Sequence, residues 1–173
     1  MTKAEDQEAR YRDAIAQYGP AIERLARAYE ADADERRDLV QDIHVALWRS
    51  FEGFDGRCSL GTWTWRVAHN AAASHVGRRR RTPHRLATLE QLESAPAGDD
   101  PEAAAGERQV LDRLSRMIQA LGPPDQQVML LYLEDLPAAE IAEITGLSPG
   151  AVAVKIHRLK ALLARRFQQG GSR

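Results

Sequence analysis

The sequence is short of cysteine, of aromatic residues and of long apolar runs, and each shortage excludes a class of protein. The single cysteine, Cys58, rules out a disulfide framework or a multi-cysteine metal site and favours a reducing cytoplasm. Aromatic residues make up only 6% of the 173 residues, which is little for a β-sandwich. Neither an apolar run of about 18 residues nor an apolar N-terminal signal segment is present, so we expect no membrane insertion and no secretion.

Signatures of catalysis and of metal binding are missing as well. The five histidines do not follow a metal-ligand spacing, and His69 and His75 are too far apart in register to share a helix face well. The sequence has no nucleophile–base pair, phosphate loop or carboxylate dyad. We therefore expect no enzymatic activity, no metal and no cofactor. For Cys58, a bystander thiol is favoured over a redox switch.

The net charge is only −1, but charges of opposite sign are segregated along the chain. Acidic residues outnumber basic ones in residues 1–42, whereas every formally charged side chain from Arg66 to Arg85 is an arginine. From Ile144 onward all charged side chains are again lysine or arginine. Two basic patches suit phosphate groups, and the acidic faces suit a different partner.

Apolar residues recur at helical spacing almost throughout, which predicts an all-α protein with two small helical domains. The first domain spans residues 1–81. Residues 82–108 are rich in proline, glycine, alanine and acids, which is typical of a flexible acidic linker. The second domain spans residues 109–173.

Breaks and caps divide the first domain into helices. The sequence predicts that one helix stops at Gly19-Pro20 and that Pro20 begins the next. A further helix is expected from Glu35 to about Phe51, ended by Gly53-Phe-Asp-Gly56. Ser59 is a plausible N-cap for the helix that runs into the arginine tract.

Residues 137–164 have the pattern of a helix-turn-helix. Gly146 permits the positive φ of a tight turn, Ser148 can cap the second helix and Pro149 fits its first position. The inward positions of this helix are Val152, Ile156, Leu159 and Leu163. The outer surface holds Ala151, Val154, Lys155, Arg158 and Leu162, flanked by Ala153, His157 and Lys160. Such a helix fits a DNA major groove, and the alternative is an ordinary helical hairpin with a solvated basic end.

The two tryptophans of the first domain indicate a second kind of contact. Trp63 and Trp65 are two residues apart on a helix, so they cannot both point into one core and one must be partly exposed. An exposed tryptophan beside Arg66, His69, Asn70 and an arginine tract offers stacking, base-edge hydrogen bonds and phosphate neutralisation, as single-stranded DNA binding requires. The alternative is an aromatic side chain that only caps the core.

The order of these motifs resembles a bacterial RNA polymerase sigma factor of the extracytoplasmic-function (ECF) type, from about Tyr18 to Phe167. Such factors keep only the regions called 2 and 4, which fits the small size. The motifs that carry the resemblance are Asp38-Leu-Val-Gln-Asp42, Leu47-Trp48-Arg49, Phe54-Asp-Gly, Thr62-Trp63, Arg66-Val-Ala-His-Asn70, the arginine run, the acidic linker, Leu121-Gly-Pro-Pro and the helix-turn-helix.

The resemblance implies three binding surfaces. The residues expected to bind the β′ clamp helices of the polymerase core are Asp38, Leu39, Gln41, Asp42, Leu47 and Trp48. Those expected at the promoter −10 element, where a flipped base is captured, are Phe54, Arg57, Ser59, Trp63, Trp65, Arg66, Asn70, Arg78, Arg79 and Arg80, with Arg81 in the same tract. Those expected at the −35 element are Ser148, Ala151, Lys155, His157, Arg158 and Lys160.

The resemblance also implies partners beyond promoter DNA. Region 4 would meet the β flap, the acidic linker would thread the RNA-exit path of the polymerase, and an anti-sigma factor would hold the protein inactive. Two alternatives stay open: a stand-alone helix-turn-helix regulator, and an inactive sigma-like module that titrates an anti-sigma factor. Ala151, Ala153 and Val154 depart from the polar residues common in the family, which predicts an unusual or less stringent −35 preference.

Overall fold

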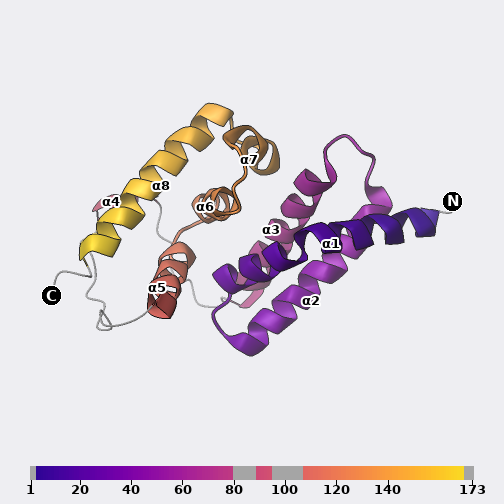
Figure 1. Ribbon diagram of the computed structural model, residues 1–173, viewed down its shortest axis with the longest axis horizontal. Coiled ribbons are helices and arrows are strands. Elements are labelled where there is room, and N and C mark those ends of the chain that lie inside the picture. The colour runs from indigo at the N-terminus through magenta and orange to yellow at the C-terminus, as the bar shows by residue number, and fades with distance from the viewer. Residues whose placement is uncertain (1–2, 80–88, 95–106, 170–173) are drawn as a thin grey trace. The chain divides into compact units, whose positions relative to one another are not determined.

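The computed structural model describes residues 3–79, 89–94 and 107–169, and the regular elements in these ranges are helices (Figure 1). The chain divides into two compact units, Met1–Pro83 with Glu143–Gly146 and His84–Ala142 with Leu147–Arg173. The prediction of an all-α protein is confirmed. Within the described ranges, no helix combines the length and the apolar character that crossing a bilayer requires.

The first unit is a bundle of three long helices. They are α1 (Lys3–Tyr29), α2 (Ala33–Ser50) and α3 (Leu60–Arg79), with a single 3-10 turn, η1 (Phe51–Gly53), after α2. All three pack against one another (Figure 1). The largest fully buried side chains of this unit are Ile22, Leu39, Ile43, Leu47 and Phe51.

The predicted helix break at Gly19-Pro20 is wrong, because α1 runs through both residues without interruption. Proline inside a helix removes one backbone hydrogen bond and costs about 3 kcal/mol. Here Ala14 and Ile22, on either side of the proline, are both fully buried in the bundle. Burial along both halves of α1 offsets the local cost, and Pro20 itself faces solvent.

Side-chain caps and a loop glycine bound the helices of the first unit. The Asp32 carboxylate caps α2 by accepting the N–H groups of Asp34 and Glu35. Gly56 has a φ of 76°, which glycine adopts without strain, in the loop that the glycines predict. The Ser59 hydroxyl accepts the N–H of Thr62 at 3.0 Å, so α3 begins where the sequence predicts.

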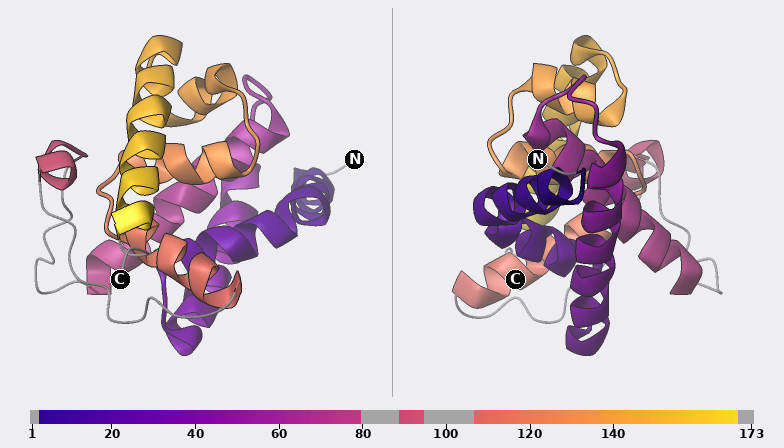
Figure 2. Two further views of the ribbon diagram at one scale, coloured as in Figure 1. Left: turned by 60° about the vertical axis from the view of Figure 1, so that its left-hand side comes forward. Right: turned by 90° about the vertical axis from the view of Figure 1, so that its right-hand side faces the viewer.

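The second unit contains α5 (Glu107–Gln119), α6 (Asp125–Leu133), the first part of α7 (Ala138–Thr145) and α8 (Pro149–Gln169). The short apolar α6 packs against both α5 and α8 (Figure 2). The fully buried side chains of the second unit include Met129, Leu131, Ile141 and Leu159. The core therefore lies between the hairpin α7–α8 and the helix that precedes it.

The helix-turn-helix prediction holds in its local details. Gly146 has a φ of 76°, Pro149 is the first residue of α8, and the Ser148 hydroxyl accepts the N–H of Ala151 at 3.2 Å. Val152 and Leu159 are fully buried as predicted, and Ile156 and Leu163 are half-buried.

One short helix lies in the segment predicted to be a flexible linker. Helix α4 (Leu89–Ser94) contacts α8, and both Leu89 and Leu92 are buried. Leu162 was expected on the outer surface of α8 but is only 2% exposed, and Arg158 and Arg166, one turn to either side of it, both bond to α4. The six residues of α4 give too little periodicity for the sequence to reveal a helix.

Candidate nucleic-acid and polymerase interfaces

The predicted polymerase-binding residues of α2 divide into exposed and buried sets. Asp38 and Gln41 are exposed, and Trp48 is 40% exposed with its ring edge-on to Tyr11 at 5.4 Å between centroids. Leu39 and Leu47 are fully buried in the bundle and cannot touch a partner. These two leucines hold α2 in place, and the surface that α2 offers to a partner is polar with one large aromatic.

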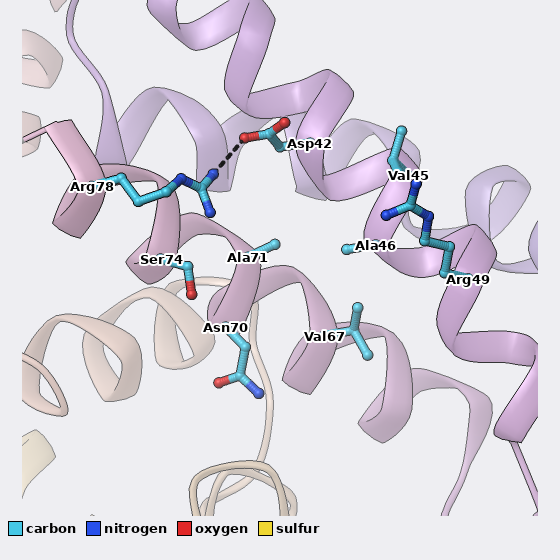
Figure 3. Close-up of a pocket in the computed structure, with 9 residues that line it drawn as sticks. All are labelled: Asp42, Val45, Ala46, Arg49, Val67, Asn70, Ala71, Ser74 and Arg78. Carbon is cyan, nitrogen blue, oxygen red and sulfur yellow. Dashed lines mark hydrogen bonds and ion pairs between the residues drawn. The ribbon is translucent and has the colours of Figure 1, made fainter.

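Asp42, the remaining predicted member, ties α2 to α3. Its Oδ2 accepts hydrogen bonds from His75 Nδ1 at 2.8 Å and from Arg78 Nη2 at 2.9 Å (Figure 3). The His75 ring is buried, and its Nε2 has no hydrogen-bond partner among the described atoms. The sequence gives no signal for His75, because residues 33 positions apart meet only through helix packing.

A hollow of about 480 Å³ lies between α2 and α3 (Figure 3). It combines small apolar side chains with the exposed amide of Asn70 and the guanidinium groups of Arg49 and Arg78. An amide can hydrogen-bond a base edge, and arginine neutralises phosphate. The full lining is Asp42, Val45, Ala46, Arg49, Val67, Asn70, Ala71, Ser74 and Arg78.

The tryptophan pair is divided as the sequence predicts, with one ring in the core. Trp65 is 3% exposed and lies against Tyr18 and His69, so its predicted contact with DNA is wrong. Trp63 is half-buried, donates its indole N–H to Ser50 Oγ at 3.0 Å and meets the Phe54 ring at 5.3 Å. Trp63 is the aromatic of the pair that a base could reach.

The loop before α3 presents both an aromatic and a cation. Arg10 lies over the Phe54 ring at 5.3 Å and donates to the Phe54 carbonyl, which fixes that residue on the bundle. The Arg57 side chain is 90% exposed and pairs with Asp55 at 3.0 Å. Ser59 is engaged as the cap of α3, and Cys58 is half-buried in the same loop.

The arginines that follow are described to different extents. Arg66 is half-buried, and the Arg78 side chain is 65% exposed although it bonds to Asp42. Arg79 is the last residue of α3, but its side chain lies outside the described residues, as do Arg80 and Arg81 entirely. The predicted phosphate contacts of these last three residues stay predictions.

A buried polar pair lies beneath the Trp65 ring. Tyr29 Oη and His69 Nδ1 are 3.1 Å apart, and His69 Nε2 has no partner among the described atoms. Burial disfavours the imidazolium and lowers the pKa of His69 to about 3, and burial raises the pKa of Tyr29. Both groups are therefore neutral at physiological pH. His69 is buried, so it cannot contact DNA.

On α8, two predicted DNA-reading cations are held within the protein. Lys155 Nζ donates to Asp125 Oδ1 at 2.5 Å, and that carboxylate is buried. Arg158 donates from Nε and Nη2 to the two oxygens of Glu93, at 3.1 and 2.6 Å. The sequence did not indicate Asp125 or Glu93 as partners, because acidic residues 30 and 65 positions away carry no local signal.

The rest of the predicted −35 set lies at or near the surface of α8. Lys160 lies over the Tyr132 ring at 5.3 Å, and His157 is exposed. Ala151 is half-buried, whereas Val154 beside it is 59% exposed. The N-terminal half of α8 therefore offers small apolar groups, with histidine and lysine at its edge.

The geometry defines a class: a helical protein with a helix-turn-helix in one unit and an exposed aromatic, amide and arginine surface in the other. The Sigma-70 region 2 family model matches residues 14–82, and the Sigma-70 region 4 model matches residues 111–163. The chain therefore belongs to the sigma-70 family of RNA polymerase sigma factors, among those of the ECF type.

Individual relatives agree with this assignment. ECF RNA polymerase sigma factor SigG of Mycobacterium tuberculosis is 30% identical over 168 residues, covering 82% of this chain but 45% of SigG. The chain thus spans less than half the length of that relative. RNA polymerase sigma factor CnrH of Cupriavidus metallidurans is 29% identical over 161 residues, covering 87% of this chain and 82% of CnrH.

A solved structure shares the fold. The structure of CnrH in complex with the cytosolic domain of CnrY matches with a TM-score of 0.69 and 22% identity. The match covers 96% of this chain and 93% of that chain. The two chains therefore share a fold.

Proposed function

We propose that this protein is an alternative sigma factor, which binds the RNA polymerase core and directs initiation at a specific set of promoters. The observation that carries the proposal is the match of both sigma regions, in family order, on one chain. Each region corresponds to a helical unit with its own buried core. Neither catalysis nor a cofactor is needed for this role, because polymerisation belongs to the partner enzyme.

Docking on the core uses the exposed face of α2, with the β′ clamp helices as the partner. Asp38 and Gln41 supply polar contacts, and Val45 and Trp48 supply exposed apolar surface in the next turns. An aromatic anchor with a polar surround is the usual composition of a protein interface. Region 4 meets the β flap in the same complex.

Promoter opening uses the hollow between α2 and α3. A base taken out of the stack needs a pocket with hydrogen-bonding groups and an aromatic wall, and unstacking costs a few kcal/mol. Asn70 in the hollow supports the first requirement, and Arg49 and Arg78 beside it suit the flanking phosphates. Trp63 lies outside the hollow, two turns before Asn70 on α3, and would supply the aromatic surface next to it. This surface would hold the non-template strand of the −10 element.

The −35 element is read by α8 with an unusual preference. Ala153 and Val154 are exposed where polar side chains are common in the family. Such side chains can contact thymine methyl groups but form no hydrogen bonds with base edges. Selection of bound sequences from a random pool should give a weakly defined, thymine-containing motif. A sharply defined motif typical of the family would contradict this part of the proposal.

A regulatory partner is also part of the proposal. The solved relative CnrH is bound to the cytosolic domain of CnrY. By analogy, an anti-sigma factor would cover the polymerase- and DNA-binding faces of this chain. The protein would then act in the cytoplasm, where polymerase and promoters are found.

Transcription in vitro tests the proposal directly. The full chain is mixed with core polymerase and genomic DNA, and start sites are mapped. We expect new start sites that depend on the protein, and we expect Asn70→Ala to lower open-complex formation about tenfold, the value of one good base contact. Gln17→Ala is the matched control, because it removes an exposed amide on α1 that does not line the hollow, and it should leave open-complex formation unchanged.

Two results would overturn the proposal. One is failure of the protein to co-purify with core polymerase, which would leave a stand-alone regulator as the better interpretation. The other is binding to core without any protein-dependent start site, which would favour an inactive module that titrates an anti-sigma factor.

A further inference from the structure

Helix α4 is attached to α8 through all three arginines of that helix. Glu93 accepts two hydrogen bonds from Arg158, with both carboxylate oxygens engaged. Arg165 donates to the Glu93 carbonyl at 3.3 Å, and Arg166 donates to the Leu92 carbonyl at 2.9 Å. These carbonyls lie at the C-terminal end of α4, where a helix carries partial negative charge and attracts cations.

Apolar contacts accompany the polar ones. Leu89 and Leu92, three residues apart, lie on one face of α4 and are buried. Leu162 of α8 is buried too, and it lies one turn after Arg158 and one turn before Arg166. Since both arginines bond to α4, Leu162 lies on the side of α8 that α4 occupies.

The face of α8 that α4 occupies is continuous with the face that would contact DNA bases. Ala151, Val154, Arg158 and Leu162 follow one another at helical spacing, so they share one side of α8. The N-terminal half of the stripe is open, with Val154 at 59% exposure, whereas α4 covers the second half. A recognition helix lies in the major groove along such a stripe, so a duplex seated on it would meet α4.

We infer that α4 is an intramolecular cover that competes with promoter DNA for α8, with the Glu93 carboxylate in the place of the DNA group that Arg158 would bind. This inference rests on the proposed function, because it assigns α8 to the −35 element. Arginine forms the same bidentate hydrogen bonds with a carboxylate, a phosphate and a guanine edge. Glu93 and a DNA group can therefore replace each other on Arg158. Full −35 binding then requires α4 to leave α8.

Such a cover lowers the apparent affinity without altering the DNA-binding residues themselves. The measured dissociation constant is the intrinsic one divided by the fraction of molecules in which α4 is released. Removing Glu93 therefore strengthens binding, although it removes an interaction from the protein. A purely structural role for α4 predicts the opposite sign, because a disturbed α8 would bind DNA less well.

Equilibrium binding of the full chain to labelled duplexes, randomised across the −35 position, tests the inference. We expect Glu93→Ala to raise the affinity about three- to tenfold, since a charge-assisted pair is lost. Glu102→Ala is the matched control, because it makes the same change of charge in the same acidic segment. In an Arg158→Ala background, Glu93→Ala should give no gain. Leu92→Ser, which weakens the apolar contact of α4, should raise the affinity as well.

The outcomes separate this inference from the proposed function. Unchanged or weaker DNA binding by Glu93→Ala, a gain equal to that of Glu102→Ala, or a gain that persists without Arg158 would overturn the inference. Weaker binding by Leu92→Ser would assign α4 a supporting role and overturn it too. Run-off transcription with core polymerase is measured in parallel: if the wild-type chain initiates normally while these affinities do not rise, only the cover is refuted.

Discussion

At the scale of single residues, burial decides which polar side chains are available to partners. Trp63 and Trp65 are neighbours in the sequence, yet only Trp63 is accessible, because the Trp65 ring is enclosed by Tyr18 and His69. The spacing of the two tryptophans predicts that one is exposed but not which one. His69 is likewise withdrawn from any role in DNA binding by its position against Tyr29.

The buried His69 makes stability depend on pH. Its pKa is about 3 in the folded protein, below the ordinary 6.5, so the unfolded chain binds more protons between these values. This contribution to stability is complete above pH 6.5 and is lost as the pH falls from there toward 3. Denaturant unfolding should show the free energy falling by up to about 1.4 kcal/mol per pH unit.

Two substitutions test whether His69 causes this pH dependence of stability. His69→Gln keeps a group that can bond to Tyr29 but does not titrate, so its unfolding free energy should depend less steeply on pH in this range. His157→Gln, on the exposed side of α8, should retain the wild-type slope. Equal slopes for wild type and His69→Gln would contradict a neutral, buried His69.

Gly61 is required by a close approach between helices. A Cβ at this position would lie within 3.1 Å of Tyr18 Cζ and closer still to its hydroxyl, and Tyr18 is itself packed on Trp65. Gly61→Ala should destabilise the protein by about 1–3 kcal/mol, the usual cost of overpacking, in urea unfolding. Gly53→Ala has open space around the new methyl group and should be nearly neutral. Equal stability of the two variants would refute this account.

At the scale of elements, α8 shows that cations on a candidate recognition helix can be bonded within the protein. Its sequence presents lysine and arginine at the spacing of a recognition surface, but Lys155 is bonded to the buried carboxylate of Asp125 on α6. A cation in this position stabilises the hairpin before it meets any DNA. Sequence patterns identify the basic face of a helix, whereas the partners of its cations come from other elements.

The Lys155–Asp125 pair should matter more for stability than the other lysine of α8. Lys155→Met leaves the Asp125 carboxylate buried without its partner, which should cost about 2–3 kcal/mol in urea unfolding. Lys160→Met removes an exposed cation over the Tyr132 ring and should cost less than about 1 kcal/mol. Similar losses for the two variants would show that Lys155 is held no more tightly than a surface lysine.

At the scale of the whole molecule, segregated charge gives a protein of net charge −1 both acidic and basic surfaces, as the proposed function requires. In the proposed function, carboxylates of the N-terminal part such as Asp38 would contact the polymerase. The exposed Arg57 and the basic helices would contact the DNA phosphates. Non-specific attraction to DNA is limited because the net charge is small, and binding depends on local patches.

Salt dependence measures one of these patches. In the proposed holoenzyme, Arg57→Ala should weaken promoter binding and reduce the slope of log affinity against log salt by about 1, the release of one counterion. Arg57 is 90% exposed, so folding should not be affected. Arg12→Ala, an exposed arginine on α1, should leave the slope unchanged. An unaltered slope for Arg57→Ala would remove this arginine from the phosphate-binding surface.

The sequence by itself determined what depends on neighbours along the chain. Helical periodicity, the Ser59 and Ser148 caps, and the glycine turns at Gly56 and Gly146 follow from backbone geometry and side-chain hydrogen bonds over a few residues. The order of motifs also sufficed to indicate the family.

Only the tertiary structure decided which residues meet across distance. The continuity of α1 through Pro20, the burial of Leu162 beneath α4 and the capture of Arg158 by Glu93 depend on packing between elements. The free energy of such contacts comes from apolar area removed from water and from charges brought together, and both are set by the fold. Periodicity along a single helix therefore cannot distinguish a side chain that faces DNA from one that is covered by another part of the same chain.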